Sequence, residues 1–190
     1  MKIDYSNMPK GQNKSIFKIK YLLNYLRTWV LLNLKYPWVN YNGFVRIMRF
    51  TGFAKRKISI GHNVQFGKYC SIAADVVFGN NILVASRVAF VGKQDHLTDL
   101  PGQTIWSSPR GKDSMTIVED DVWIGTGAII LAGIKISKGS VVAAGSLVTK
   151  DIPECEIWGG IPAKKIKDRF NSEEDKLQHL SYLSNYLNEK

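Results

Sequence analysis

Cysteine is scarce in this chain of 190 residues, which contains two, Cys70 and Cys155. The two lie far apart and form no closely spaced pair. This arrangement gives neither a disulfide framework nor a zinc-binding motif, and it fits a protein kept in a reducing compartment.

Long apolar runs are also missing. The most apolar stretch, Thr28–Val39, contains Lys35 and Pro37 and is well short of the roughly 20 residues that a transmembrane helix needs. Residues 1–13 are polar and show no apolar core of a secretory signal. We therefore expect a cytoplasmic protein.

Negative charge is nearly absent from the first part of the chain. Residues 1–57 contain 12 Lys/Arg and one acidic residue, Asp4, which gives +11. Residues 58–190 contain the remaining 14 Lys/Arg and 15 Asp/Glu, which gives −1 and accounts for the total of +10. All of the excess positive charge therefore precedes Ile58.

A six-residue repeat fills the middle of the chain, in two blocks of six hexads. Each hexad begins with an apolar residue, and in the first five hexads the fifth residue is again compact and apolar. The leading residues are Ile60, Phe66, Ile72, Phe78, Val84, Phe90, Val118, Ile124, Ile130, Ile136, Val142 and Val148. A period of six fits neither a helix face nor simple strand alternation, but it is typical of a parallel β-helix whose leading side chains point inward.

The repeat is interrupted between its two blocks. Phe90 and Val118 are 28 positions apart instead of six, so about 22 residues are inserted, within 93–116. A loop of this length in a terse solenoid is usually functional. It contains one histidine, His96, whose side-chain type has an ordinary pKa of about 6.5 and suits a general base near neutral pH. From the residues alone, a plain surface histidine is an equal alternative.

Two longer motifs resemble the hexapeptide-repeat acyltransferases, and in particular the sugar and antibiotic O-acetyltransferases among them. The second block opens with "VEDDVWIGTGAIILAGIKI" at 118–136, and the repeat closes with "VVAAGSLVTKDIPECEIWGGIPAKKIK" at 141–167. The resemblance implies a mainly β fold, a left-handed parallel β-helix with three hexads per coil. It would place two coils before the loop and two after it.

The same resemblance assigns roles to individual residues. It makes His96 the catalytic base, and Trp123 and Thr126 the border of an acetyl-CoA channel, with a backbone N–H near Thr126 facing the thioester oxygen. It makes Ala144 a point of close approach to the pantetheine arm. Four more positions would lie near the nucleotide end of acetyl-CoA: Thr149, Lys150, Lys164 and Lys167. The resemblance also implies a homotrimer with its cleft between subunits, and no metal is expected.

The basic N-terminal segment leaves two interpretations open with equal weight. It interleaves large apolar residues with Lys14, Lys18, Lys20, Arg27, Lys35, Arg46 and Arg49. Such a segment either lies on an anionic membrane, at its inner face, or packs on the solenoid with a solvated basic side. Nucleic acid is not expected, because no recognised binding motif is present.

These observations divide the chain into three parts. Residues 1–57 form a basic helical segment, residues 58–167 form the solenoid with its inserted loop, and residues 168–190 form a C-terminal helix. The predicted function is acetyl transfer from acetyl-CoA to a sugar hydroxyl of a cell-surface polysaccharide or glycolipid. The alternatives are N-acyl transfer to an aminosugar nucleotide and a catalytically inactive scaffold.

Overall fold

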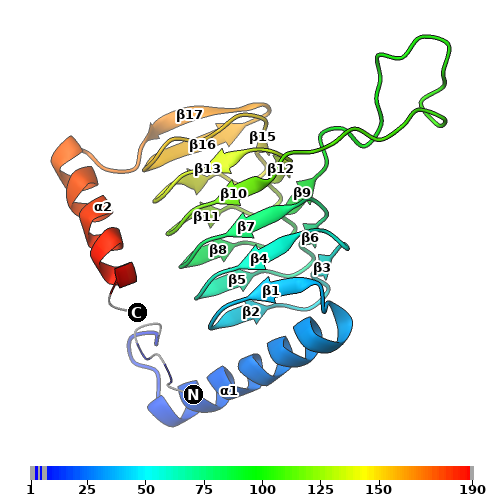
Figure 1. The fold of residues 1–190 in the computed structure, drawn as a ribbon. Coiled ribbons are helices and arrows are strands. Elements are labelled where there is room, and N and C mark those ends of the chain that lie inside the picture. Colours follow the sequence, from blue (N-terminus) through cyan, green and yellow to red (C-terminus); the bar gives the residue numbers. More distant parts are fainter. Residues whose placement is uncertain (1–2, 4, 6–7, 189–190) are drawn as a thin grey trace.

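A computed structural model describes residues 3, 5 and 8–188 and shows a parallel β-solenoid of about six coils with a helix at each end (Figure 1). Its strands stack into three sheets. Sheet A contains β1 (Val39–Tyr41), β4 (Ile58–Ile60), β7 (Val76–Phe78), β10 (Thr116–Val118) and β13 (Lys135–Ile136). Sheet C contains β3 (Gly52–Phe53), β6 (Ser71–Ile72), β9 (Ala89–Val91), β12 (Ile129–Leu131) and β15 (Leu147–Val148).

Sheet B is the longest of the three. It contains β2 (Val45–Ile47), β5 (Val64–Phe66), β8 (Ile82–Val84), β11 (Trp123–Ile124), β14 (Val141–Val142), β16 (Glu156–Gly160) and β17 (Ala163–Asp168). All strand pairs are parallel except β16–β17, whose antiparallel hairpin ends the stack. The predicted parallel β-helix is therefore confirmed.

The leading residues of the hexads form the core, as predicted. All twelve are between 0% and 2% exposed. Three of them, Phe66, Phe78 and Phe90, stack edge to face with ring centroids 5.1 Å apart at each step. The six-residue period therefore measures one straight strand plus one corner of the coil.

The fourth residue of most hexads turns the corner in the left-handed backbone region. In the first block non-glycine residues do this, including Asn63 and Asn81 with φ of 60° and 56°. In the second block Gly127, Gly133 and Gly139 take the same place, with φ of 73°, 79° and 69°. Asparagine and glycine tolerate this region better than other residues, which explains their recurrence at the corners.

The solenoid begins earlier than the sequence analysis expected. Strands β1, β2 and β3 form a complete first coil inside the segment assigned to a helix, so three coils precede the loop. The inward residues of this coil, Tyr41, Ile47 and Phe53, keep the six-residue spacing, because they pair with Ile60, Phe66 and Ile72 of the next coil. From Phe53 to Ile60 is seven positions, and this one extra residue hid the first coil from the repeat count.

Helix α1 (Lys14–Val30) continues into a short π-helical turn, η2 (Leu31–Lys35), and closes the N-terminal end of the solenoid (Figure 1). The Thr28 hydroxyl donates to the Val45 carbonyl over 2.8 Å, and Tyr21 stacks on Phe44 with centroids 4.2 Å apart. Leu32 is 1% exposed and covers the end of the core. One face of the N-terminal helix therefore packs on the solenoid, as one of the two interpretations expected.

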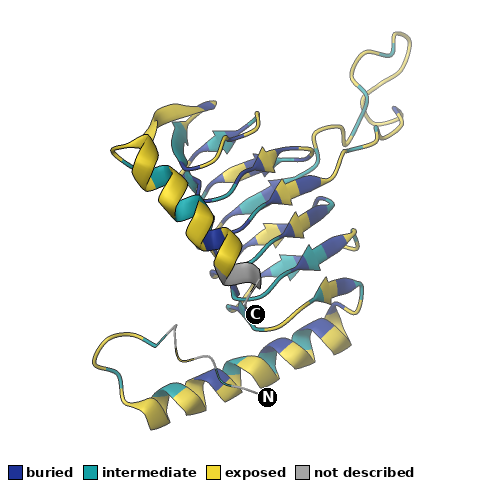
Figure 2. Cartoon of the chain, turned by 60° about the vertical axis from the view of Figure 1, so that its left-hand side comes forward, coloured by how far each residue is buried: buried dark blue, intermediate teal, exposed yellow. Residues whose placement is uncertain are grey.

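The C-terminal helix α2 (Glu173–Asn188) runs back along the outside of the coils (Figure 2). Asp121 ties it to the solenoid, because its Oδ2 lies 2.6 Å from Arg169 Nη1 and 2.8 Å from His179 Nε2. The predicted C-terminal helix is therefore present. Among the residues that the structure describes, no helix is long and apolar enough to cross a membrane.

Both cysteine thiols are buried, and desolvation raises the pKa of each. We expect neither to react with a thiol reagent in the native protein near pH 8, and both to react in denaturant. Because the folded pKa exceeds the unfolded one, the thiols should favour folding below the unfolded thiol pKa and lose this contribution as pH rises through the folded value. Thiol counting in buffer and in urea tests the first statement; rapid native labelling of Cys70 or Cys155 would contradict it.

Candidate active site

The inserted loop leaves the solenoid at one corner of the triangular coil. It runs from the end of β9 in sheet C to the start of β10 in sheet A, which is the corner between sheets C and A. The loop extends far from the coils as a separate arm (Figure 1). Its tip is strongly exposed, with Trp106 94% accessible to solvent.

His96 lies where the two sides of the loop approach each other, and its ring is half-buried. The Leu97 amide donates to the Pro109 carbonyl over 3.0 Å, and the Gly111 amide donates to the Gln94 carbonyl over 2.9 Å. Between these bonds, His96 Nδ1 lies 3.2 Å from the Ser108 carbonyl oxygen. A carbonyl can only accept, so Nδ1 carries the proton and a neutral ring keeps its lone pair on Nε2. This is the tautomer that a general base requires.

Asp113 fixes the base of the loop. Its Oδ1 accepts from the amides of Lys93 and Gln94 over 2.9 and 3.1 Å. Gly92 lies so close that a Cβ there would be 2.8 Å from Asp113 Oδ2 and 2.6 Å from Asp95 Oδ1. The carboxylate therefore holds the segment that leads directly to His96.

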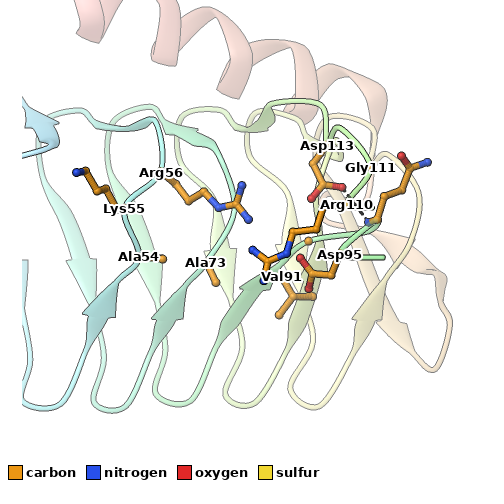
Figure 3. Close-up of a pocket in the computed structure, with 11 residues that line it drawn as sticks. Ala54, Lys55, Arg56, Ala73, Val91, Asp95, Arg110, Gly111 and Asp113 are labelled. Carbon is orange, nitrogen blue, oxygen red and sulfur yellow. Dashed lines mark hydrogen bonds between the residues drawn. The ribbon is translucent and has the colours of Figure 1, made fainter. Parts of the chain in front are cut away.

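A cavity of about 520 Å³ opens at the foot of the loop, over the corner between sheets C and A (Figure 3). Arg56 reaches it from the first coil, and Arg110 reaches it from the returning side of the loop. Asp95 and Asp113 line the same space, and the small side chains of Ala54 and Ala73 form its floor. The cavity therefore combines both signs of charge next to the segment that carries His96.

The residues expected at the acetyl-CoA channel lie on other parts of the coil. Trp123 stands outward from sheet B with 54% of its surface exposed, so it is not part of the solenoid core. Thr126 and Ala144 occupy the corner between sheets B and C on successive coils, and the Gly145 amide donates to the Thr126 carbonyl over 2.8 Å. A Cβ on Gly125 would come within 2.5 Å of the Ala144 nitrogen, so the backbones stack closely there.

Two backbone amides at this corner bear on the expectation that a backbone N–H near Thr126 faces the thioester oxygen. Within the described residues, the amides of Thr126 and Ala144 donate to no protein acceptor, whereas those of Gly127 and Gly145 do. Exposed backbone donors along one edge suit the oxygen of a thioester or the carbonyls of a pantetheine arm. The resemblance implied such an amide near Thr126, and the amide of Ala144 is the one that the sequence analysis did not name.

The four residues expected near the nucleotide are divided between two corners. Thr149 and Lys150 follow β15 and precede Ile152, which bridges to sheet A, so they lie on the same corner as the loop. Lys164 pairs with Gly159, whose added Cβ would be 2.9 Å from the Ala143 Cβ, so this lysine lies next to the Ala144 corner. Lys167 pairs with Ile157 in the same hairpin. Lys150, Lys164 and Lys167 are all exposed.

A single protomer therefore does not bring the predicted site together. His96, Thr149 and Lys150 belong to the corner between sheets C and A, whereas Thr126 and Ala144 belong to the corner between sheets B and C. The triangular cross-section of the solenoid separates these two edges.

Asp113→Ala tests whether the base of the loop positions His96. If His96 is the general base, we expect turnover to fall on the order of ten- to a hundredfold, because the imidazole shifts out of place. The KM for an acyl donor should change little, because the corner with Thr126 and Ala144 is untouched. Asp113→Asn keeps the Oδ1 acceptor and should retain most of the rate. Asp99→Ala, at an exposed carboxylate of the same loop, is the matched control; equal losses in all three variants would contradict the assignment.

Comparisons with known proteins agree with the repeat seen in the structure. Residues 115–150 match the family described as the hexapeptide repeat of succinyl-transferase. A chloramphenicol acetyltransferase of Morganella morganii is 53% identical over 116 residues, which cover 57% of this chain and 52% of that protein. The chain thus spans about half the length of the chloramphenicol acetyltransferases it matches.

Two further relatives extend the similarity. A 2,3,4,5-tetrahydropyridine-2,6-dicarboxylate N-acetyltransferase of Clostridium perfringens is 52% identical over 67 residues, covering 35% of this chain and 28% of that protein. A variant of AntD, an N-acyltransferase from Bacillus cereus crystallised with dTDP-4-amino-4,6-dideoxyglucose and coenzyme A, superposes with a TM-score of 0.54. It is 25% identical and covers 77% of this chain and 86% of that one. The chain is therefore similar, over part of its length, to hexapeptide-repeat acyltransferases.

Proposed function

We propose that the protein transfers an acetyl group from acetyl-CoA to a sugar hydroxyl of a cell-surface polysaccharide or glycolipid. The observation that carries this proposal is the hydrogen bond from His96 Nδ1 to the Ser108 carbonyl. It leaves Nε2 as a proton acceptor at the edge of the solenoid. The similarity to AntD supports the donor, because that N-acyltransferase was crystallised with coenzyme A.

The proposed reaction needs no covalent enzyme intermediate. His96 Nε2 accepts the proton of the hydroxyl as its oxygen attacks the thioester carbonyl. The amide of Thr126 donates to the carbonyl oxygen as negative charge develops there. The tetrahedral intermediate then collapses, the C–S bond breaks, and the coenzyme A thiolate takes the proton from His96. The ester and free coenzyme A leave, and the imidazole is neutral again.

The donor would lie along the corner that carries Thr126 and Ala144. Trp123 offers an exposed aromatic surface on the adjacent sheet, and the stacked backbones at Ala144 permit close approach of the pantetheine arm. The exposed ammonium groups of Lys150, Lys164 and Lys167, with the Thr149 hydroxyl, suit the phosphates of the nucleotide end. Because these groups occupy two corners, donor binding would use residues of two subunits.

A homotrimer would bring the two corners together. In a cyclic arrangement the corner between sheets C and A of one subunit faces another corner of its neighbour, and three identical contacts close the ring. The loop supports this assembly, because its arm extends away from its own solenoid and ends in the exposed Ile105 and Trp106 (Figure 1). Exposed apolar side chains of this size are typical of interaction sites.

The acceptor decides between O- and N-transfer. A hydroxyl acceptor agrees with the motifs shared with sugar and antibiotic O-acetyltransferases, and with the similarity to the chloramphenicol acetyltransferase. The alternative acceptor is the amine of an aminosugar nucleotide, which is favoured by the similarity to AntD, crystallised with such a sugar. His96 would serve both reactions, because each nucleophile must lose a proton.

Coenzyme A release over an acceptor panel tests the proposal. Purified full-length protein is mixed with acetyl-CoA and polysaccharide fragments, simple sugars, aminosugar nucleotides or chloramphenicol, and free thiol is measured. A product that hydroxylamine cleaves is an ester, and a resistant product is an amide. Ester formation on a glycan supports the proposal, amide formation alone overturns O-transfer, and no acceptor-dependent release from any compound favours an inactive scaffold.

A further inference from the structure

The outward side of helix α1 is apolar along its whole length. Its side chains on this side are between 40% and 62% exposed, and we call them the outer face of α1: Ile16, Ile19, Leu22, Leu23, Leu26, Trp29 and Val30. They recur at spacings of three and four, which places them on one side of a helix. In Figure 2 most of α1, which lies below the solenoid, is coloured as exposed.

This distribution is the reverse of an ordinary surface helix. A helix on a soluble protein turns its apolar stripe inward and its polar side to water. In α1 the inward contacts are made by Tyr21 and Thr28, which are 7% and 3% exposed, and Thr28 uses a hydrogen bond. The outer face therefore remains exposed after the helix has packed on the first coil, and several large exposed apolar side chains on one side of a helix are typical of an interaction site.

The positive charge around the outer face indicates which kind of partner binds it. The segment that contains α1 carries Lys14, Lys18, Lys20, Arg27 and Lys35, and no acidic residue occurs between Asp4 and Asp75. A second copy of α1 would bring the same positive charge without a carboxylate to neutralise it. An anionic lipid surface supplies both apolar chains and negative charge, and each nearby Lys or Arg strengthens the attraction. Long basic side chains can reach the headgroups while their stems stay among apolar groups.

Positive charge also accumulates just behind the helix. Arg27 Nε and Arg46 Nε are buried without a hydrogen-bond partner among the described residues. Burial lowers the pKa of Arg27, and the charges of Arg46 and Arg49 lower it further. Uncompensated cations at this end of the solenoid add to its attraction for an anionic surface.

We propose that α1 lies in the plane of an anionic membrane, with its outer face among the acyl chains and its basic residues at the lipid headgroups. The solenoid then stands with its N-terminal end on the membrane. Because α1 crosses the end of the coil stack, the loop root on the third coil lies about two coil spacings, roughly 10 Å, above that end (Figure 1). This proposal does not depend on the acceptor or on catalysis.

Co-sedimentation of the full-length protein with vesicles tests the proposal. We expect binding to phosphatidylglycerol–phosphatidylcholine vesicles at low salt to be at least about tenfold stronger than to phosphatidylcholine alone. It should fall sharply at 1 M salt, where the screening length is about 3 Å. The double variant Leu23→Glu/Leu26→Glu should lose binding by about tenfold or more. Leu177→Glu is the matched control, because Leu177 on α2 is 59% exposed, as is Leu26.

A site-specific probe makes the result independent of pelleting. A dye sensitive to polarity is attached to Leu23→Cys or Leu177→Cys, since both native cysteines are buried. Anionic vesicles should shift the emission to the blue at position 23 and leave it unchanged at position 177. Failure of the full-length protein to bind anionic vesicles at low salt would overturn the proposal. So would unchanged binding by the double glutamate variant, provided that its thermal unfolding matches the wild type.

Light scattering distinguishes binding of a membrane from binding of a second copy of the chain. If the outer face instead contacts another copy, the double glutamate variant should change the oligomer mass while the wild type leaves vesicles unbound, and this result also overturns the membrane proposal. An unchanged oligomer mass together with lost vesicle binding supports it. Coenzyme A release measured in the same samples shows separately whether the enzyme is active.

Discussion

His96→Ala lowers turnover on the order of 10²–10⁴-fold in the expected result, because the reaction loses the group that accepts the hydroxyl proton. The fold and the affinity for acetyl-CoA should stay nearly unchanged, since the half-buried ring makes one hydrogen bond to a loop carbonyl and lies outside the solenoid core. The measurements are coenzyme A release at saturating donor, donor binding by calorimetry, and thermal unfolding.

A substitution at His179 provides the control for this experiment. His179→Ala removes the contact from α2 to Asp121 of the solenoid, far from the loop in sequence, and should lower stability more than turnover. If the His96→Ala protein kept more than about a tenth of the wild-type rate, His96 would not be the base. A variant that lost donor affinity in parallel would instead indicate that the loop shapes the donor site.

We also expect that mixing two inactive variants restores part of the activity. His96→Ala removes the base from one corner of the coil, and Trp123→Ala removes the aromatic surface that we assign to the donor. We assume that each site takes His96 from one subunit and Trp123 from its neighbour. In trimers assembled at random from equal amounts of the two variants, each of these subunits has a chance of about one half of carrying the intact residue. About one site in four is therefore intact. We therefore expect about a quarter of the wild-type rate after dissociation and reassembly, measured against each variant treated alone.

The stoichiometry of the protein is measured on the same samples. Light scattering should give a mass near three times that of the 21.4 kDa chain. A fully active monomer would rule out the shared site. A trimer without restoration would place both residues in one subunit, which conflicts with the separation of the two corners.

The sequence was sufficient for the repetitive part of the fold. A coil of the solenoid is local in sequence, because each strand pairs with the strand one turn earlier, and the same six positions recur with the same inward side. For this reason the twelve leading residues could be identified as core, and the interruption after Phe90 marked the loop with His96. The one extra residue before Ile60 broke this local rule, and the first coil escaped detection although its inward spacing is also six.

The remaining features depended on contacts that the repeat does not encode. The proton position on His96 is set by the Ser108 carbonyl twelve residues away, on the opposite side of the loop. The separation of His96 from Thr126 follows from the triangular cross-section, which turns neighbouring sequence segments toward different directions. The apolar outer face of α1 is exposed because Tyr21 and Thr28, and not the leucines, contact the first coil. The six-residue repeat determines which side chains point into the core. Only the tertiary structure determines which groups lie next to each exposed corner and helix face.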